Sequence, residues 1–437
     1  MEWWSVLLIL WASFLILLMA GVPVAFSFLL INTIAAFIFI GGEAGLRQII
    51  LSVFDSISKF TLLPIPMFII MGEVMFITGV APEMMTTLDM WVGRIPGRLG
   101  ILAVLGGTLF ATMSGAAIAG VAMLGSVLVP EMQKRGYKKE MSLGPILGSG
   151  GLAVMIPPSA LCIVLGALAD ISIGKLLIGI IIPGLLMAFC YASYIIIRCI
   201  LQPHLAPPYD VKSTSLAEKL KATSRDILPL AFVVFAVVGT IFFGIATPSE
   251  SAAAGALACF ILAFLKGRLN WKSAKISIAN ALQITVMIFM IFAGAIVYSQ
   301  VLAYTGATRG LVSLVKGLTW HPLGILAGMQ VLLLLLGMFL EPVSIMMVTL
   351  PVFMPITRVL GFDPVWFGVI FLLNMEMAVT TPPFGLGLFV MKGVAPSGTR
   401  MGEIYKAGLP FLVCDALVII SMILFPQLVL WLPALMR

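Results

Sequence analysis

Two short segments combine small and hydroxylated residues with a double proline inside otherwise apolar stretches. The first spans residues 148–158 and the second residues 374–383, and each ends in Pro-Pro. Because proline has no amide hydrogen, each pair leaves backbone carbonyls about one helical turn earlier without partners. Such carbonyls and nearby hydroxyls suit hard, weakly held cations such as Na⁺. The segments therefore predict two cation sites at helix breaks, although tight helix packing or a plain kink would use the same residues.

Each half of the chain also carries a candidate hairpin tip. The first tip lies at residues 111–117 and the second at residues 337–342. Helices that restart after a break present free amides, and these amides suit an anionic substrate. The substrate contacts that we expect at the tips and breaks are Ser114, Gly115, Ser149, Asn374 and Thr380.

Acids within apolar segments are functional candidates, although most such acids pin helices together by accepting hydrogen bonds. The sequence has five of them: Glu73, Glu250, Glu341, Glu376 and Asp415. Glu341 and Glu376 rank first because they adjoin a hairpin tip and a break. No pair has a spacing that favours acid–base hydrolysis, and two histidines with five scattered cysteines predict neither a zinc site nor a catalytic site. We therefore expect no enzyme.

The composition of the 437 residues excludes several classes of protein. Hydrophobic residues make up 61% of the chain and charged residues 10%, and the mean hydropathy is +1.18. A soluble enzyme, a nucleic-acid binder or a disulfide scaffold could not hide so much apolar surface. The net charge of +7 is expected to come from basic loops on one membrane face. The sequence therefore predicts a helical protein that lies in the lipid bilayer.

The uncharged runs predict ten spanning helices if residues about 99–132 and about 322–357 form re-entrant hairpins. The apolar N-terminal run lacks the features of a cleaved signal and is expected to be a retained first span. With this threading, 18 of the 25 basic residues fall on one face and 7 on the other. The positive-inside rule then makes the richer face cytoplasmic and places both termini outside.

The two halves of the chain repeat each other. The pairs that match at an offset of 225 positions include Pro23 with Pro248, Pro130 with Pro355, Gly136 with Gly361, and Pro157-Pro158 with Pro382-Pro383. Five spans per half is an odd number, so the halves are expected to be inverted relative to each other. Inverted repeats with broken helices are typical of secondary transporters.

The predicted boundaries follow from this duplication. Residues 1–198 form the first repeat, 227–437 the second, and 199–226 a polar cytoplasmic connector. Residues 43–60 read as an amphipathic helix on the membrane surface or as the extension of a spanning helix.

Several strings resemble the large membrane subunit of tripartite ATP-independent periplasmic (TRAP) transporters. The resemblance runs nearly end to end, and the strings lie at residues 65–73, 156–159, 246–253, 373–376 and 381–386. It implies an elevator-type importer of the ion transporter superfamily, driven by Na⁺ and located in the bacterial inner membrane. It also implies a small four-helix membrane subunit and a periplasmic binding protein that delivers a small organic acid.

The resemblance further implies which residues hold Na⁺. The first site carries over to Ala111, Ser114, Ala153, Ile156 and Pro157, and the second to Gly337, Ala378 and Thr381. Family members often have serine where Ala111 stands and glycine where Ala153 and Ala378 stand. A carbonyl ligand survives a change to alanine, whereas the hydroxyl lost at position 111 weakens that contact.

These inferences combine into one hypothesis. A transport domain of residues about 99–170 and 322–392 moves against a scaffold and carries Na⁺ together with a carboxylate or sulfonate. The alternative within transport is a self-sufficient Na⁺/carboxylate symporter of similar fold that needs no binding protein. An intramembrane enzyme or a purely structural subunit is the alternative from another class, and nucleic acid is not expected as a partner.

Overall fold

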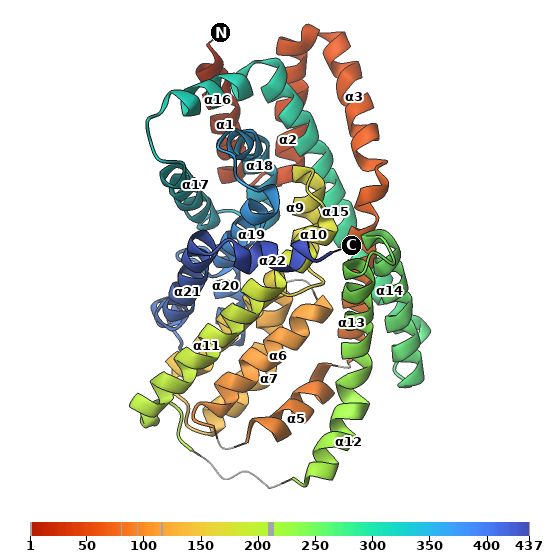
Figure 1. Ribbon diagram of the computed structural model, residues 1–437, viewed down its shortest axis with the longest axis vertical. Helices are drawn as coiled ribbons and strands as arrows, with labels where there is room; N and C mark the ends of the chain where they lie inside the picture. The colour runs from red at the N-terminus through yellow and green to blue at the C-terminus, as the bar shows by residue number, and fades with distance from the viewer. Residues whose placement is uncertain (1, 80, 94, 115–116, 209–213, 437) are drawn as a thin grey trace.

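The computed structural model describes residues 2–79, 81–93, 95–114, 117–208 and 214–436. Every regular element in this part of the chain is a helix, and Figure 1 shows the helices gathered into one elongated bundle. A helix satisfies its backbone hydrogen bonds internally, which an apolar stretch in lipid requires. The predicted all-α, polytopic fold class is therefore confirmed.

The first half of the chain contributes eleven α-helices. They are α1 (Trp3–Met19), α2 (Val24–Ala36), α3 (Glu43–Ile57), α4 (Pro64–Ile77), α5 (Ala81–Val92), α6 (Arg98–Ser114), α7 (Ala117–Lys134), α8 (Lys139–Met155), α9 (Ala160–Ala169), α10 (Ile173–Gly179) and α11 (Ile181–Leu201). A π-helical turn, Phe37–Gly41, continues α2, and 3₁₀ turns at Phe60–Leu62 and Pro203–Leu205 precede α4 and follow α11.

The second half contributes eleven more. They are α12 (Leu216–Asp226), α13 (Leu228–Phe242), α14 (Pro248–Leu265), α15 (Trp271–Tyr304), α16 (Ala307–Gly317), α17 (Pro322–Gly337), α18 (Pro342–Val359), α19 (Pro364–Thr380), α20 (Leu386–Val394), α21 (Met401–Leu424) and α22 (Gln427–Ala434). Short α-helices next to long ones thus occur in both halves.

Membrane-length helices are fewer than the ten spans that the sequence predicts. Seven helical segments in the described residues are long and apolar enough to cross a bilayer, or nine if each of two bent pairs counts as one span. The bent pairs are α8 with α9, at 44°, and α12 with α13, at 50°. Helix α1, predicted as the first span, falls short of that length at 17 residues. It ends at Met19, just before Gly21 and Pro23.

Both predicted helix breaks are present. The first break, residues 156–159, separates α8 from α9, and the second break, residues 381–385, separates α19 from α20. Each contains its double proline, which cannot donate the hydrogen bonds that would continue the helix. The helices that lead into the two breaks, α8 and α19, pack directly against each other.

A helical hairpin flanks each break. In the first half, α6 and α7 pack on each other and on α8. In the second half, α17 and α18 pack on each other and on α19. Their bounds lie within a few residues of the predicted hairpins at about 99–132 and 322–357, and their re-entrant character stays a prediction.

Two further segments differ in character from the spans. Helix α3 begins at Glu43 and exposes Ile50, Leu51 and Phe54, and its place on the membrane surface or as the extension of a spanning helix stays a prediction. The predicted connector contains a helix of its own, α12, whose N-terminus is closed by a capping box between Ser215 and Glu218. The sequence predicted a linker here because the segment is polar and rich in charge. The capping signal within it is short and is easily overlooked in such a composition.

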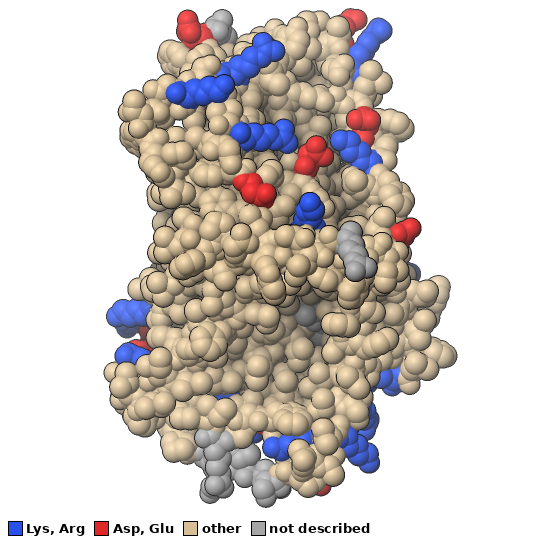
Figure 2. Space-filling model, viewed as in Figure 1, with Lys and Arg blue, Asp and Glu red and all other residues tan. Residues whose placement is uncertain are grey.

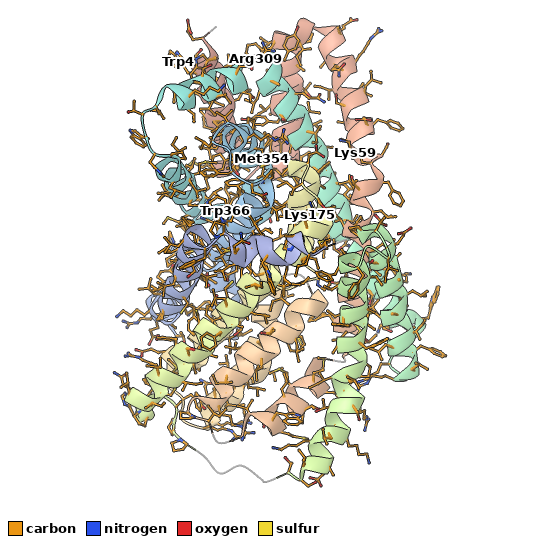
Figure 3. All side chains as sticks on the ribbon, viewed as in Figure 1. Trp4, Lys59, Lys175, Arg309, Met354 and Trp366 are labelled. Carbon is orange, nitrogen blue, oxygen red and sulfur yellow. The ribbon has the colours of Figure 1, made fainter. Side chains whose placement is uncertain are left out.

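Charged side chains are unevenly placed on the surface. Figure 2 shows them at the two ends and over the upper part of the visible face, with broad uncharged areas between. The predicted threading assigns Lys59, Lys175 and Arg309 to the outer face, and Figure 3 shows all three in the upper half of the view. Helix α12, predicted for the opposite face, lies at the bottom of Figure 1. The orientation across the bilayer stays a prediction.

Candidate functional site

The first break is enclosed by protein. All residues of α8 from Met141 to Met155 are buried, as are the predicted ligands Ala153, Ile156 and Pro157. A Cβ on Gly184 of α11 would lie 2.2 Å from the carbonyl oxygen of Met155, so α11 covers this end of α8 closely. The break is therefore a buried environment in which backbone carbonyl oxygens are the main polar groups.

Small residues bring the first hairpin onto α8. A Cβ on Gly107 would lie 2.6 Å from the Cβ of Ser149, and one on Gly120 would lie 3.4 Å from the Cα of Gly150. The Ser149 hydroxyl is fully buried and donates to the carbonyl oxygen of Pro145 in the preceding turn. Ser149 is thus placed next to the hairpin, with its hydroxyl hydrogen already used within α8.

The tip of the first hairpin is only partly described. Ala111 and Ser114 belong to α6, but their side chains lie outside the described residues, and so does Gly115 as a whole. The predicted contacts of these three residues with Na⁺ or substrate stay predictions.

The second break is better defined. The Thr381 hydroxyl donates to the carbonyl oxygen of Met377 at 2.6 Å, and the Thr380 hydroxyl donates to the same oxygen at 3.2 Å. Gly385 follows the double proline, and a Cβ there would lie 2.7 Å from the Val379 oxygen and 2.8 Å from the Thr381 oxygen. Two backbone carbonyls thus crowd around a residue that only glycine fits.

The predicted residues of the second cation site are brought together. Gly337 ends α17, and a Cβ on it would lie 2.6 Å from the Cβ of Ala378. Ala378 lies in the last turn of α19, just before Thr381. The three residues therefore share one buried region where the hairpin touches the break.

Asn374 is fully buried one to two turns before the second break. Its Nδ2 donates to the backbone oxygen of Gln330 at 3.0 Å and to the Gln330 Oε1 at 2.9 Å, which ties α19 to α17. The Asn374 Oδ1 has no partner among the described residues. It is free to accept a hydrogen bond or to contact a cation.

The five membrane acids divide into two groups. Three are occupied by helix contacts. Glu73 accepts from the Asn280 Nδ2 at 3.0 Å, Glu250 closes the N-terminus of α14 with Thr247, and Glu341 closes that of α18 through the Ser344 amide and hydroxyl. Of these three, only Glu73 links two helices, α4 and α15, whereas Glu250 and Glu341 each cap their own helix.

The other two acids, Glu376 and Asp415, lie together. Asp415 of α21 accepts a hydrogen bond from the Tyr191 hydroxyl of α11. The Glu376 carboxylate receives none from the described residues. The sequence ranked Glu376 high and did not connect it with Asp415, because 39 positions separate the two in the chain.

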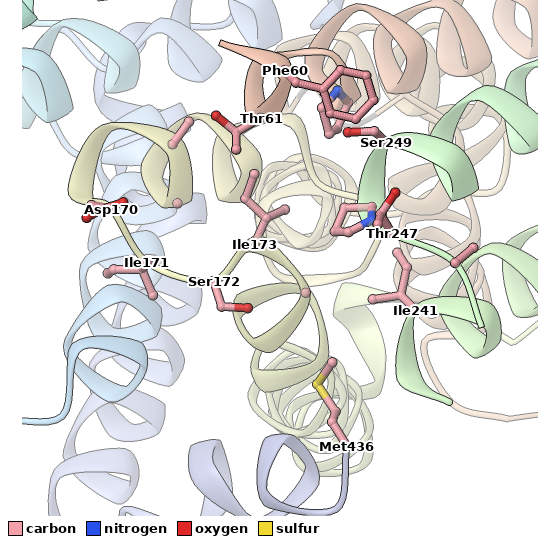
Figure 4. Close-up of a pocket in the computed structure, with 16 residues that line it drawn as sticks. Phe60, Thr61, Asp170, Ile171, Ser172, Ile173, Ile241, Thr247, Ser249 and Met436 are labelled. Carbon is pink, nitrogen blue, oxygen red and sulfur yellow. The ribbon is translucent and has the colours of Figure 1, made fainter. Parts of the chain in front are cut away.

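Two cavities lie between the helices. One, of about 270 Å³, reaches the first break at Ile156 and Pro157 and is otherwise lined by apolar residues of α6, α11 and α13. A second, of about 480 Å³, is drawn in Figure 4 and is lined by no residue of either break. Two of its polar residues, Ser172 and Thr247, already cap helices. Of these two cavities, the smaller one is therefore next to the predicted chemistry.

Comparison with known proteins agrees with this geometry. The chain matches the family model of the tripartite ATP-independent periplasmic transporter, DctM component, over residues 11–428. The C4-dicarboxylate TRAP transporter large permease protein DctM of Pseudomonas aeruginosa is 32% identical over 388 residues, which cover 89% of each chain. The sialic acid TRAP transporter large permease protein SiaM of Vibrio cholerae is 30% identical, with 96% of each chain covered.

A solved structure shares the fold. The YdaH transporter of Alcanivorax borkumensis superposes with a TM-score of 0.66 over 91% of each chain, and the two sequences are 15% identical. The superposition supports a common architecture. Sequence identity this low says nothing of the substrate.

Broken helices packed side by side in an all-helical membrane fold define a polytopic transporter. This chain belongs to the DctM family, the large permease components of TRAP transporters. The resemblance seen in the sequence is thereby confirmed, and its relatives are transport permeases rather than enzymes.

Several residues that shape the site were missed in the sequence. Gly184 and Gly385 each allow a close approach to another stretch of backbone at or beside a break. Gly385 carried a signal, since a glycine two positions after a double proline favours a tight turn. Gly184 lies in an unremarkable apolar run, and only the packing of α11 on Met155 reveals its role.

Proposed function

We propose that this protein imports a small organic acid anion together with Na⁺ by moving a transport domain against a scaffold. The observation that carries the proposal is the contact of α8 with α19, the two helices that lead into the breaks. Each is flanked by its own hairpin, so backbone carbonyls and small residues from both halves converge in one buried region. This arrangement is typical of secondary transporters that bind ions and substrate near the middle of the bilayer.

The proposed second Na⁺ site consists of Gly337, Ala378 and Thr381. The contact between Gly337 and Ala378 supports it, because it brings the hairpin within reach of the Thr381 hydroxyl oxygen. Thr381 donates its hydrogen to Met377 and so turns a lone pair outward. An oxygen with that orientation suits a hard cation.

The proposed first Na⁺ site consists of Ala153, Ile156 and Pro157 at the break, with Ala111 and Ser114 at the hairpin tip. Burial of the three break residues supports it, since carbonyls that proline leaves without helix partners there can face a bound cation. Because alanine stands at position 111, the ligands of this site are backbone carbonyls and at most one hydroxyl.

The proposed substrate is a carboxylate or sulfonate bound between the breaks. Ser114, Gly115, Ser149, Asn374 and Thr380 are the contacts that we infer. Relatives are named for a C4-dicarboxylate and for sialic acid, which are both organic acids. Amides at the restarting helices α9 and α20 would attract the anionic group.

The proposed movement follows from the division of the chain. Residues about 99–170 and 322–392 carry both breaks and both hairpins and form the transport domain. The remaining helices form the scaffold, and the two halves are inverted repeats. Na⁺ binding orders the hairpin tips and thereby completes the anion site, so that ion and substrate move together.

Two partners are proposed from the family. A small four-helix membrane subunit works with this chain, and a periplasmic binding protein delivers the substrate. The complex lies in the bacterial inner membrane with both termini of this chain in the periplasm.

Reconstitution tests the proposal. Proteoliposomes that contain this chain with its small subunit, and the binding protein loaded with a labelled organic acid, should accumulate the acid only under an inward Na⁺ gradient. Uptake that is indifferent to the Na⁺ gradient would refute the coupling. Uptake of the free acid by this chain alone would favour the self-sufficient symporter instead.

A further inference from the structure

Two acids meet between α19 of the proposed transport domain and α21 of the proposed scaffold, at a point that neither break occupies. Glu376 of α19 has no exposed surface, and Asp415 of α21 is 1% exposed. Their carboxyl groups lie within hydrogen-bonding distance of each other. Two ionised carboxylates are both acceptors, so this contact satisfies neither of them.

Within the described residues, no positively charged group is found to interact with the pair. The other ionisable groups that interact with the two carboxylates are Tyr191 on α11, Cys190 beside it and Cys414 next to Asp415. None of the three carries a positive charge at any pH. The Tyr191 hydroxyl donates to Asp415, and both oxygens of Glu376 are without a donor in the described part of the chain.

The protein makes room for the Glu376 carboxylate at one glycine. A Cβ on Gly151 of α8 would lie 1.5 Å from the Glu376 Oε1, so the carboxylate rests on bare backbone. Helices α8, α11, α19 and α21 pack around this point. Gly151 therefore leaves space for the carboxylate and supplies no side-chain donor to it.

A buried carboxylate without a partner is costly, by several kcal/mol for each ion. Two of them at one point attract a cation strongly. Among the described residues no three His, Cys, Asp or Glu side chains stand together, which argues against a transition-metal centre. Carboxylate and hydroxyl oxygens suit a hard ion, and a pair with a single hydroxyl offers too few ligands for a divalent cage.

We propose that Glu376 and Asp415 hold one monovalent cation between α19 and α21, at a site separate from the two breaks. The Tyr191 hydroxyl orients Asp415 toward it, and Gly151 leaves space for Glu376. The site goes beyond the proposed function because it adds an ion to those at the breaks. Since α8 and α19 both touch it, its occupancy also holds the two broken helices together.

The number of bound ions tests the site without any transport measurement. The full chain, purified with its small subunit, is unfolded thermally while NaCl replaces choline chloride at constant ionic strength. At Na⁺ concentrations well above the dissociation constant, each ion that binds only the folded state adds RT to the slope of the unfolding free energy against the natural logarithm of the Na⁺ concentration. Glu376→Gln and Asp415→Asn should each lower the wild-type slope by one ion, and equilibrium binding of ²²Na⁺ should fall by one per chain.

Glu73→Gln is the matched control, because Glu73 is also a membrane acid but has a donor in Asn280. It should leave the slope unchanged. If the Gln and Asn variants do not fold, Tyr191→Phe keeps the ring and should raise the Na⁺ concentration for half-maximal stabilisation several-fold. If the break sites bind no Na⁺ but the Glu376–Asp415 site does, the wild-type slope corresponds to one ion and disappears in Glu376→Gln. A failure of the break sites can therefore be told apart from a failure of the Glu376–Asp415 site.

Two results would overturn the site. One is a slope, and a ²²Na⁺ count, that Glu376→Gln and Asp415→Asn leave at the wild-type value. The other is the same unchanged slope together with a pH dependence of the unfolding midpoint that both variants abolish, since the pair would then hold a proton and no metal ion.

Discussion

Gly337 and Ala378 touch where the second hairpin meets the second break. A Cβ on Gly337 would lie 2.6 Å from the Cβ of Ala378 and 2.9 Å from its Cα. Real Cβ atoms do not approach so closely, so neither residue can grow unless α17 moves away from α19. The contact therefore fixes the distance between the hairpin and the last turn of the broken helix.

Gly337→Ala should separate these two elements. We expect a loss of stability of about 1–3 kcal/mol, because the added methyl group overpacks the contact. We also expect a higher Na⁺ requirement for uptake, because Gly337 would move away from Thr381. Thermal unfolding and the Na⁺ dependence of uptake in proteoliposomes measure the two effects.

Gly328→Ala is the control for this change. Gly328 lies in the same helix, and a Cβ there would meet nothing within 4 Å. Alanine favours a helix over glycine by up to about 1 kcal/mol, so this variant should be neutral or more stable. If the two variants behaved alike, the contact with Ala378 would have no special role.

The breaks were predictable from sequence, and the contacts between them were not. A double proline in an apolar run interrupts a helix wherever it occurs, so Pro157 and Pro382 located both interruptions. The pairing of Glu376 with Asp415, or of Gly184 with Met155, depends on which helices become neighbours. That choice is made by packing over the whole bundle, and a lone glycine or acid in an apolar stretch carries no sign of its partner.

Arg98 is expected to be important for the base of the first hairpin. Its guanidinium donates to the Asp89 Oδ1 at 2.9 Å and to the Gly93 carbonyl at 3.0 Å, and the residue is 4% exposed. Lysine keeps the charge but lacks the planar set of donors. Arg98→Lys should therefore destabilise the protein by about 2 kcal/mol or more, measured by thermal unfolding.

Arg135→Lys is the matched case at the surface. Arg135 pairs with Glu131 one turn earlier, at 2.6 Å between Nη2 and the carboxylate, but both side chains reach solvent. An exposed pair of this kind contributes at most about 0.5 kcal/mol. An Arg98→Lys variant as mildly affected as Arg135→Lys would mean that burial adds nothing at Arg98.

Asn374→Ala should affect the substrate and leave Na⁺ alone. The side chain is anchored to Gln330 through Nδ2, which leaves Oδ1 to accept from a substrate hydroxyl. We expect a several-fold rise in the substrate concentration for half-maximal uptake at saturating Na⁺. Initial rates over a series of substrate concentrations measure it, with the Na⁺ dependence recorded in parallel.

The effect of losing the hydrogen bonds between Asn374 and Gln330 has to be separated from the effect of losing a contact between Asn374 and the substrate. Gln330→Ala removes one acceptor of the same hydrogen bonds but keeps Asn374. Both variants should lose stability, on the order of 1 kcal/mol. A substrate response that is equal in the two variants would assign Asn374 to the support of α17, with no contact to the substrate.

Thr381→Ala addresses the second Na⁺ site directly. The Thr381 hydroxyl donates to Met377, and its oxygen is the side-chain ligand that we propose. If that oxygen contributes about 1.4 kcal/mol to ion binding, its removal should raise the Na⁺ concentration for half-maximal uptake about tenfold. Thr349→Ala loses an equivalent bond, 2.6 Å from its hydroxyl to the Ile345 oxygen, in a buried part of α18. Because both variants lose one hydroxyl that donates to a helix carbonyl four residues earlier, a shift seen only at position 381 isolates the ion contact, and an equal shift at both positions would reduce it to a general loss of stability.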